Sequence, residues 1–210
     1  VTLVRDLLNH DILPVIPRQG SVGASGDLAP LAHMALPLIG EGLVHFQDRI
    51  MPAMLAMKEV DLQPLVLDPK EGISLINGTQ VSTAIGIKAC LEAENLLKIA
   101  DLVGAISVEA SLSSRSVFKS SIHKLKKHPG QRLVAANIWN LLRDSEIVLS
   151  HKDCDRVQDP YSFRCIPHVH GISRDNYNGA RKIVQNEANS VSDNPLIMPN
   201  NQIMNSGHFH

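Results

Sequence analysis

The sequence predicts a mainly α-helical fold, in which a bundle of long helices adjoins an irregular region of loops and short elements. Of the 210 residues, 44% are hydrophobic, yet only one Trp, two Tyr and four Phe are present. β-sandwiches and barrels use more aromatic and alternating β-branched positions than this. Residues 79–110 contain no proline and repeat apolar residues at helical spacing. Helices are therefore expected to carry most of the fold.

The first part of the chain, residues 1–76, predicts short elements separated by loops. Residues 1–9 place four leucine and valine side chains at helical spacing, and prolines then interrupt the chain before a glycine-rich loop at 19–27. Asp27 is expected to cap a helix that begins at Leu28. Residues 40–76 mix glycines, prolines and short apolar runs, which predicts loops, short helices and a small hairpin.

The second part, residues 77–210, predicts a long-helix bundle. One helix should run from Thr79 through residue 110, with a kink near Gly104. The stretch 96–108 is apolar on nearly all sides, which indicates burial on more than one side, in a bundle or an oligomer interface. Further helices are expected at 130–150 and 175–190, with a polar loop over residues 151–170.

Charge and cysteine usage exclude several classes of function. The formal net charge is −1, which argues against nucleic-acid and anionic-membrane binding. No apolar run has the roughly 18 to 20 residues of a membrane span, and no leader pattern is present. Cys90, Cys154 and Cys165 form neither a disulfide framework nor a zinc motif, which favours a cytoplasmic protein. The His-x-His and His-x-x-Cys pairs have no third and fourth ligand at metal spacing, so no bound metal is expected.

The glycine-rich loop at residues 20–27 fits poorly to the common ligand-binding loops. Its spacing is neither that of a dinucleotide loop nor that of a P-loop, and it is not a nucleophile elbow. A turn before a capped helix is the plain structural alternative. One chemistry needs Ala24, Ser25 and Gly26 together: the Gly26 amide nitrogen can attack the Ala24 carbonyl, since glycine permits a tight approach. Loss of two waters then gives a methylidene-imidazolone (MIO), an electrophilic alkene.

The segment 20–33, Gly-Ser-Val-Gly-Ala-Ser-Gly-Asp-Leu-Ala-Pro-Leu-Ala-His, resembles the signature of the aromatic amino-acid ammonia-lyase and aminomutase family. Four further blocks resemble the family in the same order, so that the resemblance covers nearly the whole chain: 70–83, 158–165, 187–196 and 206–210. Two of these blocks resemble the branch of the family that acts on histidine. They contain Gln-Asp-Pro-Tyr-Ser at residues 158–162 and Asn-Gly-Thr-Gln at residues 77–80.

The resemblance implies roles for individual residues. Ala24, Ser25 and Gly26 would form the MIO, and Asn77 would steady this ring and the substrate. Tyr161 would lie against the prosthetic group. Four further residues would bind the substrate. Arg164 would form a bidentate pair with its carboxylate, Gln158 and Asn194 would extend the hydrogen-bond network, and Phe209 would wall the pocket. His208 departs from the family, which usually has Asn before this Phe.

The activity implied is elimination of ammonia from L-histidine to give trans-urocanate, with no external cofactor. The resemblance also implies a homotetramer whose active sites draw on more than one subunit, with Tyr161, Arg164 and Phe209 acting across an interface. The resemblance begins well inside the family's sequence. It therefore lacks the tyrosine that removes the β-proton of the substrate and the C-terminal helices, and the chain alone is expected to be inactive. Two alternatives stay open: a phenylalanine or tyrosine ammonia-lyase or aminomutase, and a non-catalytic helical assembly protein.

Overall fold

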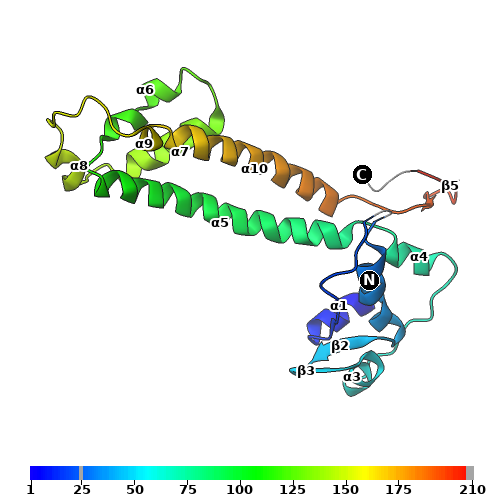
Figure 1. The fold of residues 1–210 in the computed structure, drawn as a ribbon. Coiled ribbons are helices and arrows are strands. Elements are labelled where there is room, and N and C mark those ends of the chain that lie inside the picture. Colours follow the sequence, from blue (N-terminus) through cyan, green and yellow to red (C-terminus); the bar gives the residue numbers. More distant parts are fainter. Residues whose placement is uncertain (24–25, 207–210) are drawn as a thin grey trace. The chain divides into compact units, whose positions relative to one another are not determined.

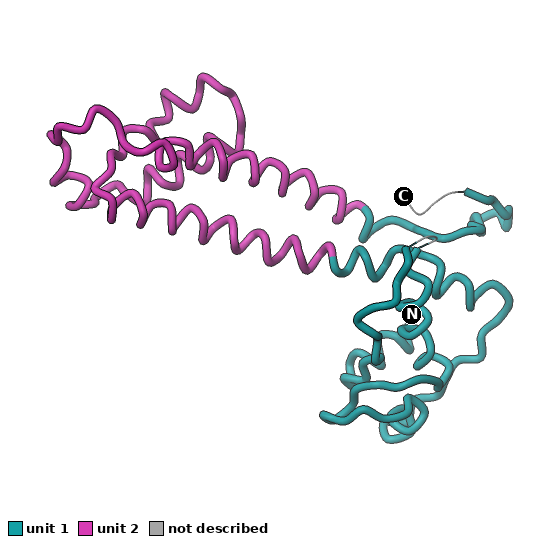
Figure 2. The backbone as a smooth tube through the Cα atoms, in the orientation of Figure 1, with its two compact units in different colours: residues 1–85, 187–210 teal, residues 86–186 magenta. Residues whose placement is uncertain are grey.

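The computed structural model of the chain describes residues 1–23 and 26–206, which form two compact units. The first unit combines residues 1–85 with the segment that begins at residue 187, and the second unit is residues 86–186 (Figure 2). Helices dominate, which confirms the predicted fold class. The division expected between residues 76 and 77 stays a prediction, whereas these units divide two helices of the chain. Within the described part of the chain, no helix is both long and apolar enough to cross a membrane.

The first unit consists of short elements around a small antiparallel sheet with strand order β1-β2-β3 (Figure 1). Its elements before α5 are α1 (Thr2–Asn9), β1 (Leu13–Pro14), α2 (Leu28–Ala35), the 3₁₀ helix η1 (Leu36–Ile39), β2 (Leu43–Phe46), β3 (Arg49–Pro52), α3 (Ala53–Glu59) and α4 (Glu71–Ile76). Gln47 and Asp48 both have positive φ in the turn between β2 and β3, as the twist of a tight hairpin requires. The short helices and the hairpin expected within residues 40–76 are therefore confirmed.

The core of the first unit collects one face of each of these elements. In β2, Val44 and Phe46 are buried, whereas the alternating residues Leu43 and His45 are exposed. This two-residue period is that of a strand with one solvated face. From α1 only Leu7 is buried. The complete cluster is Leu7, Ile12, Leu38, Val44, Phe46, Ala53, Ala56 and Met57. The returning segment of the unit carries a second small hairpin, β4 (Leu196–Ile197) and β5 (Ile203–Met204).

The second unit is built on two long helices, α5 and α10, that pack antiparallel. Gly86 of α5 lies against Val184 of α10, and Gly104 lies against Ile166, so sequence runs in opposite directions along the pair. The elements of this region are α5 (Gln80–Ala110), η2 (Arg115–Phe118), α6 (Ser120–His123), α7 (Pro129–Leu141), α8 (Glu146–Ser150), α9 (Tyr161–Arg164) and α10 (Ile166–Ala188). The long helix expected from Thr79 is confirmed, and it continues through Gly104 as one helix.

Much of the apolar surface of α5 is exposed. Its buried positions are Asp101, Gly104, Ala105 and Val108, which face the core made with α7, η2 and the start of α10. Five large apolar side chains of its middle are about half exposed or more: Leu96 65%, Ile99 52%, Leu102 48%, Val103 52% and Ile106 54%. The expectation that this stretch is buried on more than one side is therefore not met within the chain.

Two helix predictions were wrong in their bounds. The helix expected over 130–150 is broken, because α7 ends at Leu141 and Ser145 caps a new helix, its Oγ accepting a hydrogen bond from the Val148 N–H at 3.1 Å. The polar loop expected over 151–170 contains α9 and the first turn of α10, which begins at Ile166 instead of 175. Ile166 is buried, and Pro167 suits a first helical turn, so packing and the N-terminal preference of proline extend α10.

Candidate active site

Gly26, the third residue of the predicted MIO tripeptide, lies against Gly78, in the short connection between α4 and α5. Gly26 has φ +81°, and a Cβ placed on it would overlap the Gly78 backbone. The next residue, Asp27, donates its N–H to the Gly78 carbonyl at 2.6 Å. Both the left-handed backbone and the close contact restrict position 26 to glycine. Ala24 and Ser25 lie outside the described residues.

Asp27 fixes the same contact through its side chain, and the predicted capping role was wrong in this respect. Asp27 occupies the N-cap position of α2, but its carboxylate makes no capping bond. It accepts instead from the Ser82 N–H and the Ser82 Oγ, each at 2.6 Å. Because Ser82 lies in the first turn of α5, a buried carboxylate joins the end of the glycine-rich loop to that helix.

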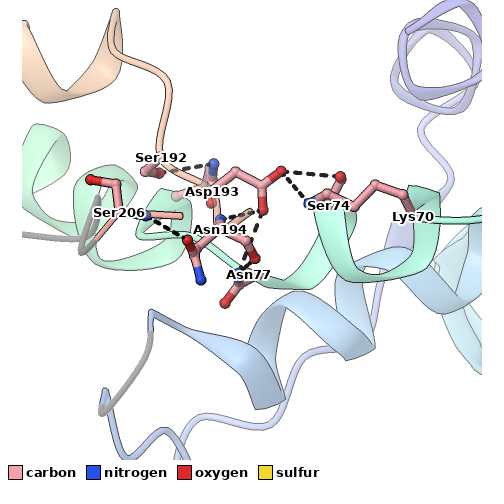
Figure 3. Close-up of polar contacts among 8 residues, drawn as sticks. Lys70, Ser74, Asn77, Ser192, Asp193, Asn194 and Ser206 are labelled. Atoms are coloured by element: carbon pink, nitrogen blue, oxygen red, sulfur yellow. Dashed lines mark hydrogen bonds and ion pairs between the residues drawn. The ribbon is translucent and has the colours of Figure 1, made fainter. Parts of the chain in front are cut away.

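Asn77 and Asn194, two of the predicted site residues, meet directly (Figure 3). The Asn77 side chain donates Nδ2–H to the Asn194 backbone carbonyl at 2.8 Å and contacts Asp193 Oδ1 at 3.5 Å. The Asn194 Oδ1 accepts from the Ser206 N–H at 2.9 Å. Residues 193–206 are thus held at the C-terminal end of α4, more than a hundred positions away in the sequence, where Asn77 is only 8% exposed.

Asp193 is the centre of this network. Its carboxylate accepts from Lys70 Nζ at 2.7 Å, from Ser74 Oγ at 3.1 Å and from the Asn194 N–H at 2.7 Å. Burial by itself would raise the pKa of Asp193, but the hydrogen bond from Lys70, with those from Asn194 and Ser74, lowers this pKa below its usual value. Asp193 is therefore ionised at neutral pH.

Gln158, Tyr161 and Arg164 form a second group, within the second unit. Tyr161 begins α9 and is 72% exposed, whereas Arg164 ends this helix and donates Nε–H to the Asp159 carbonyl at 2.9 Å. The Arg164 guanidinium carbon lies 5.3 Å from the centre of the Tyr161 ring. The Asp159 carboxylate accepts from the Ser114 N–H at 2.7 Å, which ties this turn to the end of α5. The outer part of the guanidinium, its two Nη groups, has no partner among the residues described.

Gln158 and Arg164 line a cavity of about 520 Å³ whose wall is rich in positive charge. Among its described lining residues, Asp159 is the carboxylate, and the cationic side chains are Arg115, Lys119, Arg143, Lys152, Arg156 and Arg164. A wider hollow that also includes Tyr161 shares Gln158, Asp159 and Arg164 with it. Such a wall favours anionic groups, and a substrate carboxylate is one of them.

Sequence reasoning missed Lys70, Asp193 and Ser206, although each lies inside a block that it selected. Their positions in the sequence could have identified them, because Lys70 is the first residue of the block that contains Asn77, and Asp193 directly precedes Asn194. Phe209 lies outside the described residues. Within residues 1–23 and 26–206, no three His, Cys, Asp or Glu side chains gather in an arrangement that could hold a metal.

Comparison with protein families places this chain among known sequences. A family model described as aromatic amino acid lyase matches residues 1–210. Histidine ammonia-lyase of Myxococcus xanthus is 49% identical over 211 residues, which cover 100% of this chain and 42% of that protein. Histidine ammonia-lyase of Gloeobacter violaceus is 48% identical over 97% of this chain and 40% of its own length. The chain thus spans about two fifths of the length of these curated relatives.

Solved structures agree with the sequence comparisons. Phenylalanine aminomutase of Pantoea agglomerans superimposes with a TM-score of 0.90 at 32% identity, over 98% of this chain and 43% of that one. Histidine ammonia-lyase of Trypanosoma cruzi gives a TM-score of 0.85 at 36% identity, over 97% of this chain and 38% of that one.

Proposed function

The chain belongs to the aromatic amino acid lyase family, and from this premise we propose that it supplies part of a lyase that eliminates ammonia from L-histidine to give trans-urocanate. The observation that carries the choice of histidine is the 46% to 49% identity to proteins named histidine ammonia-lyase, over essentially the whole chain. The Gln-Asp-Pro-Tyr sequence at 158–161 supports the same choice. Identity to the solved structures does not separate the substrates, because the aminomutases, a phenylalanine ammonia-lyase and a histidine ammonia-lyase all lie between 31% and 37%.

We propose that Ala24, Ser25 and Gly26 close into an MIO. The Gly26 conformation supports this, because the amide nitrogen that must attack belongs to a residue whose positive φ and contact with Gly78 admit only glycine. Asp27, bonded to Gly78 and Ser82, would hold the C-terminal side of the tripeptide during closure. The ring, once formed, supplies an electrophile that makes the substrate nitrogen a better leaving group.

The remaining site residues would bind and orient the amino acid. Arg164 has a guanidinium edge available for a bidentate pair with the substrate carboxylate, in a wall whose positive charge attracts anions. Tyr161, exposed beside it, would lie against the prosthetic group. The other predicted members, which would complete the hydrogen-bond network and wall the pocket, are Gln158, Asn77, Asn194 and Phe209.

We further propose that the protein is a homotetramer with active sites shared between subunits. The exposed apolar side chains of α5 support this, since contiguous apolar surface on a helix commonly marks an interface between chains. Tyr161 is mostly exposed in this chain, as expected of a residue that completes a site in a neighbouring subunit. The cytoplasm is the proposed location, on the basis of the three unpaired cysteines.

The test uses the natural protein that carries this sequence, incubated with L-histidine, L-phenylalanine or L-tyrosine. Urocanate should form from histidine, and the intact mass should be lower than the sequence mass by two water molecules. Ser25→Ala is the matched control, which should keep the full sequence mass and lose activity. If cinnamate, coumarate or a β-amino acid is the main product, the protein acts on phenylalanine or tyrosine and the assignment of histidine is wrong. An unmodified mass in the wild-type protein would support the non-catalytic alternative.

A further inference from the structure

Asn77 offers both of its amide N–H groups to partners that can only accept. One partner is the Asn194 backbone carbonyl, 2.8 Å from Nδ2, and the other is the Asp193 carboxylate, 3.5 Å from it. Neither an ionised carboxylate nor a carbonyl can donate a hydrogen bond. The amide nitrogen must therefore face this pair, and the reverse orientation would set two acceptors against Oδ1. Among the residues described, Oδ1 of Asn77 has no hydrogen-bond partner.

We propose that Lys70 and Asp193 are positioning residues, whose ion pair fixes the Asn77 amide with its nitrogen toward Asp193 and Asn194 and its oxygen free for the substrate. The Lys70 Nζ lies 2.7 Å from Asp193 Oδ2, and both side chains are less than one fifth exposed. Lys70 and Ser74 occupy Oδ2, which leaves Oδ1 for Asn77 and the Asn194 N–H. One carboxylate oxygen of Asp193 therefore binds Lys70 and Ser74, and the other binds Asn77 and the Asn194 N–H (Figure 3).

The backbone of Lys70 supports a role beyond a surface ion pair. Lys70 has φ +79° at the N-cap position of α4, a left-handed conformation that is unfavourable for a residue with a side chain. Glycine would adopt this conformation without strain, yet the position holds a lysine whose side chain reaches across 123 residues of sequence to Asp193. The ion pair with Asp193 is thus formed by a residue whose backbone conformation favours glycine.

The consequence for the reaction, which rests on the proposed function, is that Asn77 presents a hydrogen-bond acceptor to the substrate and not a donor. A free Oδ1 accepts hydrogen bonds, so it suits the amino group of the substrate and disfavours its carboxylate, which needs donors such as Arg164. If Asp193 became an amide, its own N–H could donate to Asn77 Oδ1 and the Asn77 side chain could turn over. The acceptor would then be lost from the site without any change in its residues.

The first test compares wild type with Asp193→Asn in the natural protein that carries this sequence. We expect kcat for histidine to fall about 10²-fold, as for a misplaced catalytic geometry, while the mass deficit of two waters is retained. Exchange of the Asn77 Nδ2 protons with solvent, followed by NMR, should accelerate in the variant. An unchanged kcat in an active enzyme, or unchanged exchange, would overturn the proposal. If wild type converts no amino acid, the proposed function fails, and the exchange measurement still decides the positioning.

The second test uses Lys70→Gly and Lys70→Met, which also serve if Asp193→Asn does not fold. Glycine relieves the backbone strain and methionine keeps it, but both remove the ammonium group. A positioning role predicts the same loss of kcat in both, with the higher melting temperature for Lys70→Gly. A structural role predicts that Lys70→Gly keeps kcat, and that outcome would contradict the proposal. Glu92→Gln, which breaks the exposed pair with Lys88, is the matched control and should leave kcat unchanged.

Discussion

The candidate site residues of the two units are held in different ways. In the first unit, Asn77 is buried and bonded to residues more than a hundred positions away in the sequence. In the second unit, Tyr161 is exposed and Arg164 is held by a local bond to the Asp159 carbonyl. The first group therefore contributes to the stability of its own unit, whereas the second group lies at the surface of its unit.

The second unit has its own buried polar centre, whose hydrogen-bond partners are not its candidate site residues. Asp101 of α5 is 3% exposed and accepts from Arg174 and Asn137, each at 2.8 Å. In this unit, polar residues that stabilise the fold and polar residues proposed for the reaction are different sets. Substitutions should therefore separate stability from activity in the second unit and couple them in the first.

The largest effect is expected for Asp101→Ala. It leaves the Arg174 guanidinium, only 14% exposed, without its carboxylate, and should lower the free energy of unfolding by about 3 to 5 kcal/mol. Chemical denaturation measures this loss. The double variant Asp101→Ala/Arg174→Met should recover most of it, because the uncompensated charge is gone. If the single variant is as stable as wild type, Asp101 is not the polar centre of the unit.

A smaller loss is expected for Asn77→Ala, about 1 to 3 kcal/mol, because the Asn194 carbonyl loses its donor in a buried setting. Activity should fall with it, which is the coupling that distinguishes the first unit. The readouts are the denaturation midpoint and the rate of urocanate formation. Loss of activity at full stability would mean that the network around Asn77 does not stabilise the unit.

The third effect is a dependence of stability on pH in the second unit. Burial lowers the pKa of His168, and the positive charge of His123, with Lys126 and His128, lowers it further. The folded protein therefore holds His168 neutral where the unfolded chain would bind a proton. The stabilisation is complete above about pH 6.5 and is lost as pH falls below it. His168→Gln should flatten the melting temperature between about pH 7 and pH 5, and an equally steep slope would assign the effect to other groups.

The smallest change in stability is expected for Tyr161→Ala, less than about 1 kcal/mol, because its contact with Arg164 is exposed. Activity of the natural protein should nevertheless fall about 10²-fold if this ring positions the reacting groups. Thermal unfolding and kcat, measured on the same sample, give both values. A large loss of stability would place Tyr161 with Asn77 and remove the contrast between the units.

The sequence predicts those parts of the fold that depend on local periodicity. The helix from Thr79 follows from its proline-free apolar pattern, and the hairpin from short apolar runs between turn residues. The break after α7 also has a local signal, since Asp144-Ser145-Glu146 is a helix start, but the continuing apolar pattern concealed it. The early start of α10 has one local signal, the proline at position 167, but it also depends on the burial of Ile166 against α5, a tertiary contact that no local pattern contains.

Only those site residues that lie in the blocks resembling the family could be predicted from the sequence. The blocks that resemble the family contain Asn77, Tyr161 and Arg164, but nothing in one sequence links Lys70 to Asp193 or Asp27 to Ser82. Asp27 shows why: the local rule for a carboxylate before a helix is capping, and the structure uses it for a bond to another helix instead. Such pairs depend on the tertiary fold, which brings distant carboxylates and donors together.

The division of the first unit into two pieces of chain sets an order for its synthesis. Asn77 leaves the ribosome before the 86–186 segment, whereas Asp193, Asn194 and Ser206 follow that segment. A nascent chain that ends at residue 186 already contains every residue of the second unit, yet its Asn77 has none of these partners. The acceptor geometry at Asn77 is therefore a late event of translation, completed only after the tail of the first unit has emerged.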